Sequence, residues 1–339
     1  MQKLENERRR MNTFESSREG YRIVEFSMPL VETKLSRKVE RMPFVPSKGL
    51  SGRCEDIISM QALGLKKRLS HTKAKCVVIG ISGGLDSTLA LLVSAKAMEM
   101  LGRPMTDIIA VTMPCFGTTE KTRSNAQLLC EALGVTFRQI DIGKSVIQHF
   151  EDIGHDPNKF DAAYENSQAR ERTQVLMDLA NKNNGLVVGT GDLSELALGW
   201  ATYNGDHMSM YGVNASIPKT LVRSLVEYIG SNTDNGELKN VLRDIADTPI
   251  SPELLPPEHG EIAQKTEELV GPYELHDFFL YCIVRWGFGP HKTYRLAIYA
   301  FDGMYDCETI LKWLKTFYKR FFSQQFKRSC MPDGPKVGS

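Results

Sequence analysis

The chain has 339 residues, of which 42% are hydrophobic and 24% are charged, as in ordinary folded globular proteins. Its 42 basic residues almost balance its 41 acidic residues, so the net charge is only +1. This balance gives no general attraction for nucleic acid or for an anionic membrane, and we expect neither as a partner.

Cellular location is indicated by what the sequence lacks. No apolar run approaches the roughly 20 residues that cross a bilayer, and the charged N-terminus has no apolar core of the kind found in signal peptides. The seven cysteines form no Cys-x-x-Cys pair. An odd number at irregular spacing disfavours a disulfide framework and a zinc site, so we predict a reduced, cytoplasmic setting.

Residues 1–50 contain too little patterned apolar sequence for a core, and we interpret them as a linker. The main domain is predicted over residues 51–330, with a short tail at 331–339 that has no element of its own. Within the domain, short β-branched runs predict buried strands; these are residues 75–81, 107–112, 135–140 and 185–190. Helical periodicity marks residues 55–68, 87–100, 119–133 and 161–182.

Strands that alternate with helices predict an α/β fold, a doubly wound parallel sheet with flanking helices. In such sheets ligands bind beyond the carboxyl ends of the strands. Residues 232–261 are rich in Pro, Asp and Asn and predict a mobile connection. Residues 262–325 predict a C-terminal, aromatic-rich helical segment.

A glycine-rich loop follows the first strand and leads into a helix. Its two adjacent glycines allow backbone N–H groups to approach an anion, and the helix N-terminus adds free donors. These features suit pyrophosphate, although a simple turn with Asp86 and Ser87 as helix caps is the alternative. The loop comprises Gly80, Ile81, Ser82, Gly83, Gly84, Leu85, Asp86, Ser87 and Thr88.

The loop lacks the Gly-Lys-Ser/Thr of a Walker motif. It resembles instead the S-G-G-x-D-S signature of the N-type ATP pyrophosphatases, which cleave ATP between the α and β phosphates. The resemblance implies that residues 80–87 bind ATP and that Asp86 is a ligand of Mg²⁺, an ion that prefers carboxylate and phosphate oxygens.

A second block, residues 189–200, follows the fourth strand and reads G-T-G-D-L-S-E-L-A-L-G-W. Its local alternative is a helix cap, with Asp192 capping and Glu195 completing a capping box. The block resembles that of the glutamine-dependent NAD synthetases. The resemblance implies that Thr190 contacts ATP and that Glu195 contacts the second substrate and the metal. It also implies a deamido-NAD segment comprising Trp200, Ala201, Thr202 and Tyr203.

Further segments carry the same resemblance. The helix containing Asn166 and Arg170 matches the family's E-N-x-Q-A-x-x-R-T pattern and implies contacts with deamido-NAD, with Arg172 as a second candidate beside Arg170. The matching Asp206 and Lys219 are implied as catalytic groups near the nicotinate end. Lys327, in Gln325-Phe326-Lys327-Arg328-Ser329, is implied to reach the substrate. A solvated surface role is the alternative for Arg170, Arg172 and Lys327, and a capping or surface role is the alternative for Lys219.

The resemblance, which covers almost the whole chain, implies an ATP- and Mg²⁺-dependent ligase that amidates deamido-NAD through an acyl-adenylate. The N-terminal glutaminase domain of the family has no counterpart here, and we expect free ammonia to be the nitrogen donor. The family also implies a homodimer.

Two other functions remain open from the sequence. GMP synthetase, asparagine synthetase and tRNA-thiolating enzymes share the first loop but not the second block. A domain that binds deamido-NAD without turning it over is the non-enzymatic alternative.

Overall fold

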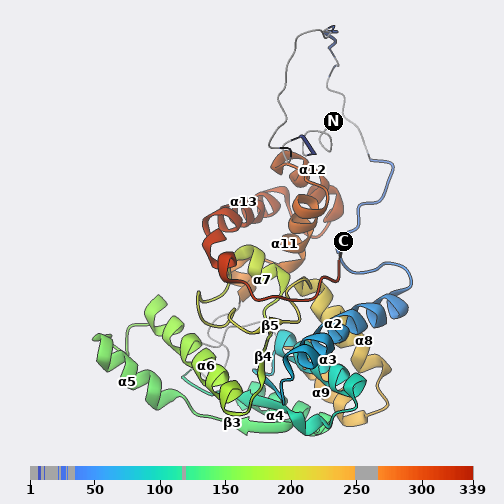
Figure 1. Ribbon diagram of the computed structural model, residues 1–339. Helices are drawn as coiled ribbons and strands as arrows, with labels where there is room; N and C mark the ends of the chain where they lie inside the picture. The colour runs from blue at the N-terminus through green and yellow to red at the C-terminus, as the bar shows by residue number, and fades with distance from the viewer. Residues whose placement is uncertain are drawn as a thin grey trace.

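The computed structural model describes residues 7–8, 11, 22, 24–27, 29, 35–116, 120–248 and 266–338. Its centre is a five-stranded sheet in the order β3-β2-β1-β4-β5 (Figure 1). The strands are β1 (Val77–Gly80), β2 (Ile108–Thr112), β3 (Thr136–Gln139), β4 (Leu186–Gly189) and β5 (Tyr211–Gly212). All four pairings are parallel, which confirms the predicted doubly wound sheet.

The central strand β1 pairs on both sides, with Val77 opposite Ile108 of β2 and Leu186 of β4. Its apolar residues are buried on both faces, as expected where helices cover a parallel sheet. The strand order reverses beside β1, because β2 and β3 lie to one side and β4 and β5 to the other. This reversal point is where doubly wound sheets open a crevice for ligands.

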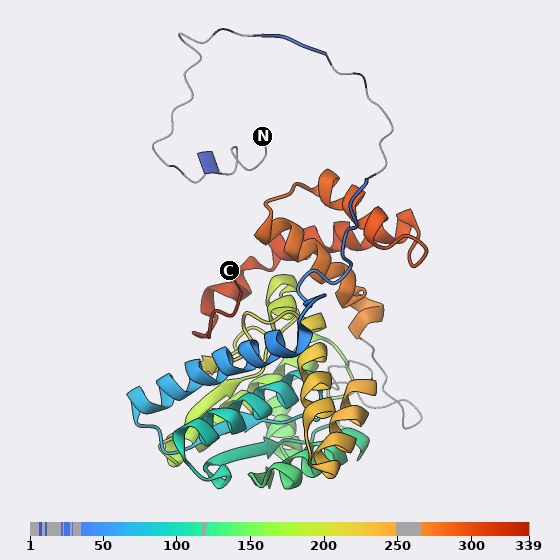
Figure 2. The same ribbon diagram turned by 90° about the vertical axis from the view of Figure 1, so that its right-hand side faces the viewer.

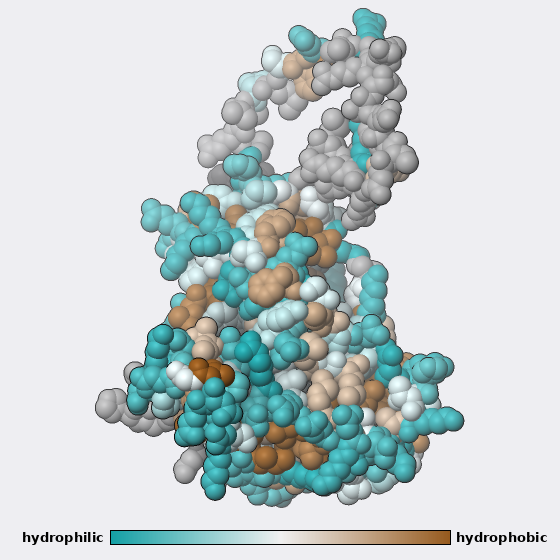
Figure 3. Space-filling model, turned by 60° about the vertical axis from the view of Figure 1, so that its left-hand side comes forward, coloured by the Kyte–Doolittle hydropathy of each residue, from teal (hydrophilic) through white to brown (hydrophobic). Residues whose placement is uncertain are grey.

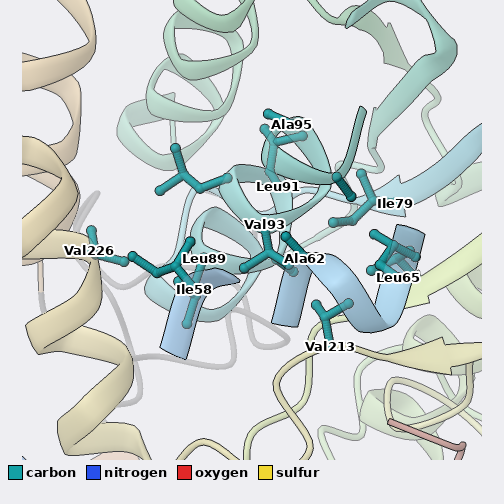
Figure 4. Packing of buried hydrophobic residues seen from close by; sticks show 14 of the residues in the cluster. Ile58, Ala62, Leu65, Ile79, Leu89, Leu91, Val93, Ala95, Val213 and Val226 are labelled. Carbon is teal, nitrogen blue, oxygen red and sulfur yellow. The ribbon is translucent and has the colours of Figure 1, made fainter. Parts of the chain in front are cut away.

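One face of the sheet is covered by α2 (Leu50–Thr72), α3 (Leu85–Leu101), α4 (Glu120–Leu133), α8 (Lys219–Asn232) and α9 (Gly236–Asp247) (Figure 2). Apolar residues at helical spacing make this contact. Figure 4 shows Ile58 and Ala62 of α2 packed beside Leu89 and Val93 of α3. These two helices form the largest part of the main core.

The opposite face carries α5 (Gly143–Ile153) and α6 (Ala162–Lys182). Phe150 of α5 and Tyr164 of α6 stack with ring centres 5.5 Å apart. Asp161 caps α6 by accepting from the N–H groups of Ala163 and Tyr164, so the predicted helix begins close to where periodicity placed it. The sequence interpretation missed α5, although its two buried residues, Val146 and Phe150, lie one helical turn apart.

A separate helical cluster lies beyond the carboxyl edge of the sheet (Figures 1 and 2). It contains α10 (Thr266–Val270), α11 (Tyr273–Leu280), a π-helical turn η2 (Tyr281–Arg285), α12 (Pro290–Ala300), α13 (Cys307–Ser323) and η3 (Gln325–Cys330). The short helix α7 (Leu193–Leu198) joins it through Ala197 and Leu198. From the predicted linker, Phe44 packs edge-on against Tyr281 at 5.1 Å.

The prediction of a mobile connection over residues 232–261 is wrong for its first half, which forms α9. Asn235 caps this helix by accepting from the N–H groups of Glu237 and Leu238. The buried Leu238, Val241, Leu242 and Ile245 repeat at helical spacing, and that period outweighs the polar residues between them. Residues 249–261 lie outside the described part of the chain.

The C-terminal segment 331–338 has no helix or strand but packs beside the edge strand β5. The N–H of Gly212 donates to the carbonyl of Asp333 at 2.8 Å, and the Ser216 hydroxyl donates to the carbonyl of Pro335 at 2.7 Å. Arg68 of α2 forms an ion pair with Asp333 at 2.9 Å. The segment therefore shields one open edge of the sheet, where unpaired backbone groups would otherwise remain.

None of the helices among the described residues is both long and apolar enough to cross a membrane. In the face shown in Figure 3, hydrophilic residues cover most of the surface and hydrophobic ones emerge in scattered groups. Isolated groups of this kind are ordinary on a folded domain.

Replacing Gly334 with alanine should loosen the C-terminal segment. A Cβ at this position would lie 2.3 Å from the Gly212 carbonyl oxygen, and a backbone atom cannot move aside cheaply. We expect Gly334→Ala to reduce the free energy of unfolding by about 1–3 kcal/mol and to speed proteolysis of residues 331–338. Gly338→Ala is the control, because no described atom lies within 4 Å of its added Cβ. Equal stability of the two variants would contradict the packing.

Acid should destabilise the helical cluster through His276. Its Nε2–H donates to the Val270 carbonyl at 2.6 Å, and burial lowers the pKa of His276 from 6.5 to about 4. The folded state therefore favours neutral His276, and the stability it contributes is present above pH 6.5 and lost as pH falls through 4. His276→Gln keeps a donor but does not titrate. Urea unfolding at several pH values should show a smaller loss for this variant between pH 6.5 and 4.5.

Candidate active site

A cavity of about 530 Å³ opens at the carboxyl ends of β1 and β4, where the strand order reverses. Its wall combines the loop after β1, the start of α7, the segment after α7, part of α6 and the C-terminal region. Most residues predicted from the sequence to form the site line this cavity: Gly80, Ile81, Ser82, Gly83, Gly84, Leu85, Asp86, Ser87, Asn166, Thr190, Glu195, Trp200, Ala201, Thr202, Asp206 and Lys327. Residues far apart in the sequence therefore meet in one place.

The loop after β1 is shaped for an anion. Gly83 has φ +81°, a left-handed conformation that glycine adopts without strain. The Ser82 hydroxyl accepts from the Gly84 N–H at 3.2 Å and lies 3.2 Å from the Ser87 hydroxyl. Among the described residues, no side chain caps the start of α3. Its first N–H groups thus face the cavity as donors for a phosphate.

Asn214 links the loop after β1 to the loop after β4, and the sequence interpretation missed this role. Its fully buried amide nitrogen donates to the backbone carbonyls of Asp86 at 2.9 Å and Thr190 at 3.1 Å. Gln61 of α2 in turn donates to the Asn214 side-chain oxygen at 3.1 Å. The two sequence blocks are therefore held at a fixed separation by side chains outside both.

The centre of the site is an ion cluster around Lys219 at the start of α8. Its Nζ lies 2.5 Å from Asp86 Oδ2, 2.9 Å from Glu195 Oε1 and 3.1 Å from Asp192 Oδ2. The side chains of Lys219 and Asp192 are 3% and 0% exposed, whereas Asp86 and Glu195 are about one-fifth exposed toward the cavity. One buried ammonium therefore contacts all three carboxylates.

Burial and charge act against each other in this cluster. Burial alone would lower the pKa of Lys219, but Asp192, Asp86 and Glu195 raise it well above its usual value, so the ammonium stays charged. Burial raises the pKa of Glu195 to about 7 against the opposing effect of Lys219, and it raises the pKa of Asp192 in the same way. Burial therefore makes both carboxyl groups easier to protonate, and a nearby cation would favour their ionised forms.

The same carboxylates fit a divalent cation. Oxygen atoms of Asp86, Asp192 and Glu195 lie within 4.8 Å of one another, and hard cations such as Mg²⁺ prefer oxygen ligands of this kind. Asp86 Oδ1 is buried and accepts no hydrogen bond from the described residues. Asp192 was expected only as a helix cap. It does cap α7, with Oδ1 2.7 Å from the Glu195 N–H, but its other oxygen faces Lys219.

Two cations, from Lys327 and Arg320, converge on the carbonyl end of α7. Lys327 donates to the carbonyls of Gly199 at 2.9 Å and Ala201 at 2.6 Å, while Arg320 of α13 donates to those of Leu198 and Gly199. Positive charge at a helix C-terminus is favourable because the last carbonyls are unpaired there. Burial, with the nearby Arg320, lowers the pKa of Lys327.

The loop after α7 is held by polar contacts within itself and with α6. The Thr202 hydroxyl donates to Asn166 of α6 at 2.7 Å, and the Thr202 N–H donates to Asp206 at 2.6 Å. His207 is bound to the Thr202 carbonyl at 2.9 Å. Thr202 therefore anchors the loop to α6, and Asp206 is partly committed to holding the loop.

Three residues predicted for the site do not line the cavity. Lys219 lies behind Asp86 and Glu195. Arg170 donates to the Tyr203 carbonyl at 3.3 Å, and the Tyr203 ring turns outward against Phe326. Arg172, the second of the two arginine candidates, does line the cavity and donates to the Met113 carbonyl at 3.2 Å.

Residues of this site lie in a region that is similar to known proteins. The family model described as NAD synthase matches residues 57–285, a range that contains both glycine-rich blocks and the ion cluster. A glutamine-dependent NAD(+) synthetase of Mycobacterium leprae is 44% identical over 98% of this chain and 54% of its own length. The chain therefore spans about half the length of the curated relatives that it matches over nearly all of its own residues.

A shorter relative and a solved structure agree. An NH(3)-dependent NAD(+) synthetase of Methanococcus aeolicus is 34% identical over 52% of this chain and 68% of that protein. The crystal structure of a glutamine-dependent NAD(+) synthetase from Cytophaga hutchinsonii superposes with a TM-score of 0.67 at 19% identity, covering 83% of this chain and 51% of that one. The structural likeness supports the fold.

Replacing Lys219 with methionine should leave three carboxylates without their cation. We expect Lys219→Met to lose about 3–5 kcal/mol of stability in EDTA, as is typical when one partner of a buried ion pair is removed. Added Mg²⁺ should restore part of this loss, because it supplies the missing positive charge. Urea unfolding with and without Mg²⁺ measures both effects.

Lys96→Met is the matched control, because within the described ranges the ion pair of Lys96 is the one with Glu99 on α3. It should change stability by less than about 1 kcal/mol. Equal behaviour of the two variants would contradict a structural role for the buried ammonium.

Proposed function

The chain belongs to the NAD synthase family, and we propose that it joins ammonia to deamido-NAD at the expense of ATP, giving NAD, AMP and pyrophosphate. The observation that carries this proposal is the convergence of the anion-binding loop, the uncapped start of α3 and the carboxylate cluster on one cavity. A carboxylate needs activation before an amine can replace its oxygen, and adenylation by ATP supplies that activation.

The ATP side of the cavity is the loop after β1 together with Thr190. Its N–H and hydroxyl groups would hold the β and γ phosphates and stabilise the departing pyrophosphate. Asp86 and Glu195, joined by Asp192, would hold Mg²⁺, which when bound neutralises phosphate charge. The close spacing of the oxygen atoms of these three carboxylates supports this assignment.

The deamido-NAD side comprises Asn166, Trp200, Ala201 and Thr202, with Lys327 above them. A pyridinium ring is a flat cation that favours an aromatic face. The Arg320 guanidinium lies over one face of the Trp200 ring, 5.0 Å from its centre, so the nicotinate ring would use the other face. Arg170 and Tyr203 would then act by supporting the loop.

The proposed reaction would take place in two displacement steps. An oxygen of the nicotinate carboxylate attacks the α phosphorus, the bond to the β-phosphate oxygen breaks, and pyrophosphate leaves. Ammonia then attacks the acyl carbon, loses a proton and expels AMP to form the amide. Asp206 would receive the incoming amine, and Lys219 would balance the charge on Asp86 and Glu195 while the phosphates bind. Their positions in and behind the cavity wall support these roles.

Ammonia is the donor that we propose for this chain. The relatives that match this chain include proteins named glutamine-dependent and a Methanococcus protein named NH(3)-dependent. We also propose a homodimer, on the resemblance to the family.

The test is an assay of the purified chain with ATP, Mg²⁺, deamido-NAD and ammonium chloride, in which NAD is followed with alcohol dehydrogenase. We expect NAD from ammonium chloride and none from glutamine.

Asp86→Ala should reduce the rate by roughly 10²–10³-fold, because it removes a group that stabilises charge in the transition state.

Asp333→Asn is the control for a lost carboxylate, because the Asp333 side chain is exposed and pairs only with Arg68 among the described residues. Its rate should equal that of the unaltered chain. No NAD from either nitrogen source with folded protein, or an Asp86→Ala variant of normal rate, would overturn the proposed function or the assignment of Asp86.

A further inference from the structure

A second buried carboxylate lies behind the ion cluster, on a helix of the C-terminal cluster. Asp277 of α11 is fully buried and accepts three hydrogen bonds. The Ser194 hydroxyl donates to Oδ1. The N–H and the hydroxyl of Thr220 donate to Oδ2 at 2.9 and 2.7 Å. One side chain therefore joins α11 to the first turns of α7 and α8.

The donors to Asp277 are the chain neighbours of two residues of the ion cluster. Ser194 precedes Glu195, and Thr220 follows Lys219. The Ser194 hydroxyl also accepts from the Lys219 N–H at 2.9 Å. The two helix starts are thus tied together through Ser194 and Asp277, and their side chains meet at the 2.9 Å contact between Lys219 and Glu195.

The local sequence explains why α8 needs help from a distant residue. Pro218 stands at its N-cap position and provides no side-chain cap, although the first N–H groups of a helix require partners. Asp277 supplies the carboxylate that a local Asp or Ser would otherwise provide. A negative charge at two helix N-termini is also favoured by their dipoles.

The same face of α11 makes a second contact with the cluster. Tyr273 lies one turn before Asp277, and its ring centre is 5.2 Å from Lys219 Nζ. The ring is buried and confines the ammonium on the side away from the cavity. Together Tyr273 and Asp277 leave Lys219 little freedom to move.

We propose that Asp277 is a positioning residue of the reaction, which sets the distance between Glu195 and Lys219 by holding the first turns of α7 and α8. It does not touch the cavity and acts through Ser194 and Thr220. Outer groups of this kind commonly change metal affinity or activity by about 10–100-fold when they are altered. This inference rests on the proposed function for its kinetic part but not for its structural part.

Asp277→Asn is the main test. Asparagine can still accept from Thr220, but its amide turns a donor toward Ser194, which must then reorient. We expect kcat to fall by about 10–100-fold, with the KM for deamido-NAD changed less than about twofold. Mn²⁺ affinity, measured by electron paramagnetic resonance, should fall in parallel. A residue that only stabilised the fold would change neither kcat nor Mn²⁺ affinity in protein that remains folded.

Hydrogen exchange gives a readout that is independent of turnover. In Asp277→Asn, amides at 219–222 should exchange at least about tenfold faster, while those of β1 stay protected. The control is Glu274→Gln on the same helix, because Glu274 accepts from Tyr305 at 2.7 Å, away from the cavity. It should leave kcat, Mn²⁺ affinity and exchange at 219–222 unchanged.

Thr220→Val serves if Asp277→Asn does not fold, because it removes one hydroxyl donor and keeps the N–H. It should show a smaller loss in kcat and faster exchange at 219–222. The positioning role is overturned if the folded variants, Asp277→Asn or Thr220→Val, match Glu274→Gln in kcat and in exchange. If the unaltered chain makes no NAD, the proposed function fails, and local exchange alone decides whether Asp277 holds the two helices.

Discussion

The ammonium of Lys219 is the interaction on which the rest of the site depends. It lies among three carboxylates from the loop after β1 and from α7, which would repel one another if buried without it. Its presence allows the two chain segments to approach closely beneath the cavity. A divalent cation would likewise favour the ionised forms of these carboxylates.

Helix termini supply most of the remaining chemistry. The start of α3 offers N–H groups to the cavity, the starts of α7 and α8 are held by carboxylates, and the end of α7 is surrounded by Lys327 and Arg320. Each charge lies where the helix dipole favours it. The site is therefore built from the backbone groups at helix ends. Side chains of residues distant in the sequence, such as Arg320 and Lys327, bond to these groups and hold them in place.

The helical cluster is part of the site as well as a second core. Its helix α11 lies against α7 and α8 (Figure 1) and meets the ion cluster through Tyr273 and Asp277. Its last turn, η3, brings Lys327 to the carbonyls of Gly199 and Ala201. Disturbing this cluster should therefore affect the cavity even where no cluster residue faces it.

The alternation of strands and helices and the two glycine-rich blocks could be predicted from the sequence, because hydrophobic period and turn chemistry are local properties. The sequence interpretation missed α5 and α9, although their buried residues lie at helical spacing; for α9, the Pro, Asp and Asn content of residues 232–261 predicted a connection instead. The partners of Lys219 could be identified only from the folded chain, because Lys219 lies 133 residues from Asp86 and 24 from Glu195. The same is true of Asn214 and Asp277, because their contacts arise where separate helices pack and leave no periodic signal in the chain.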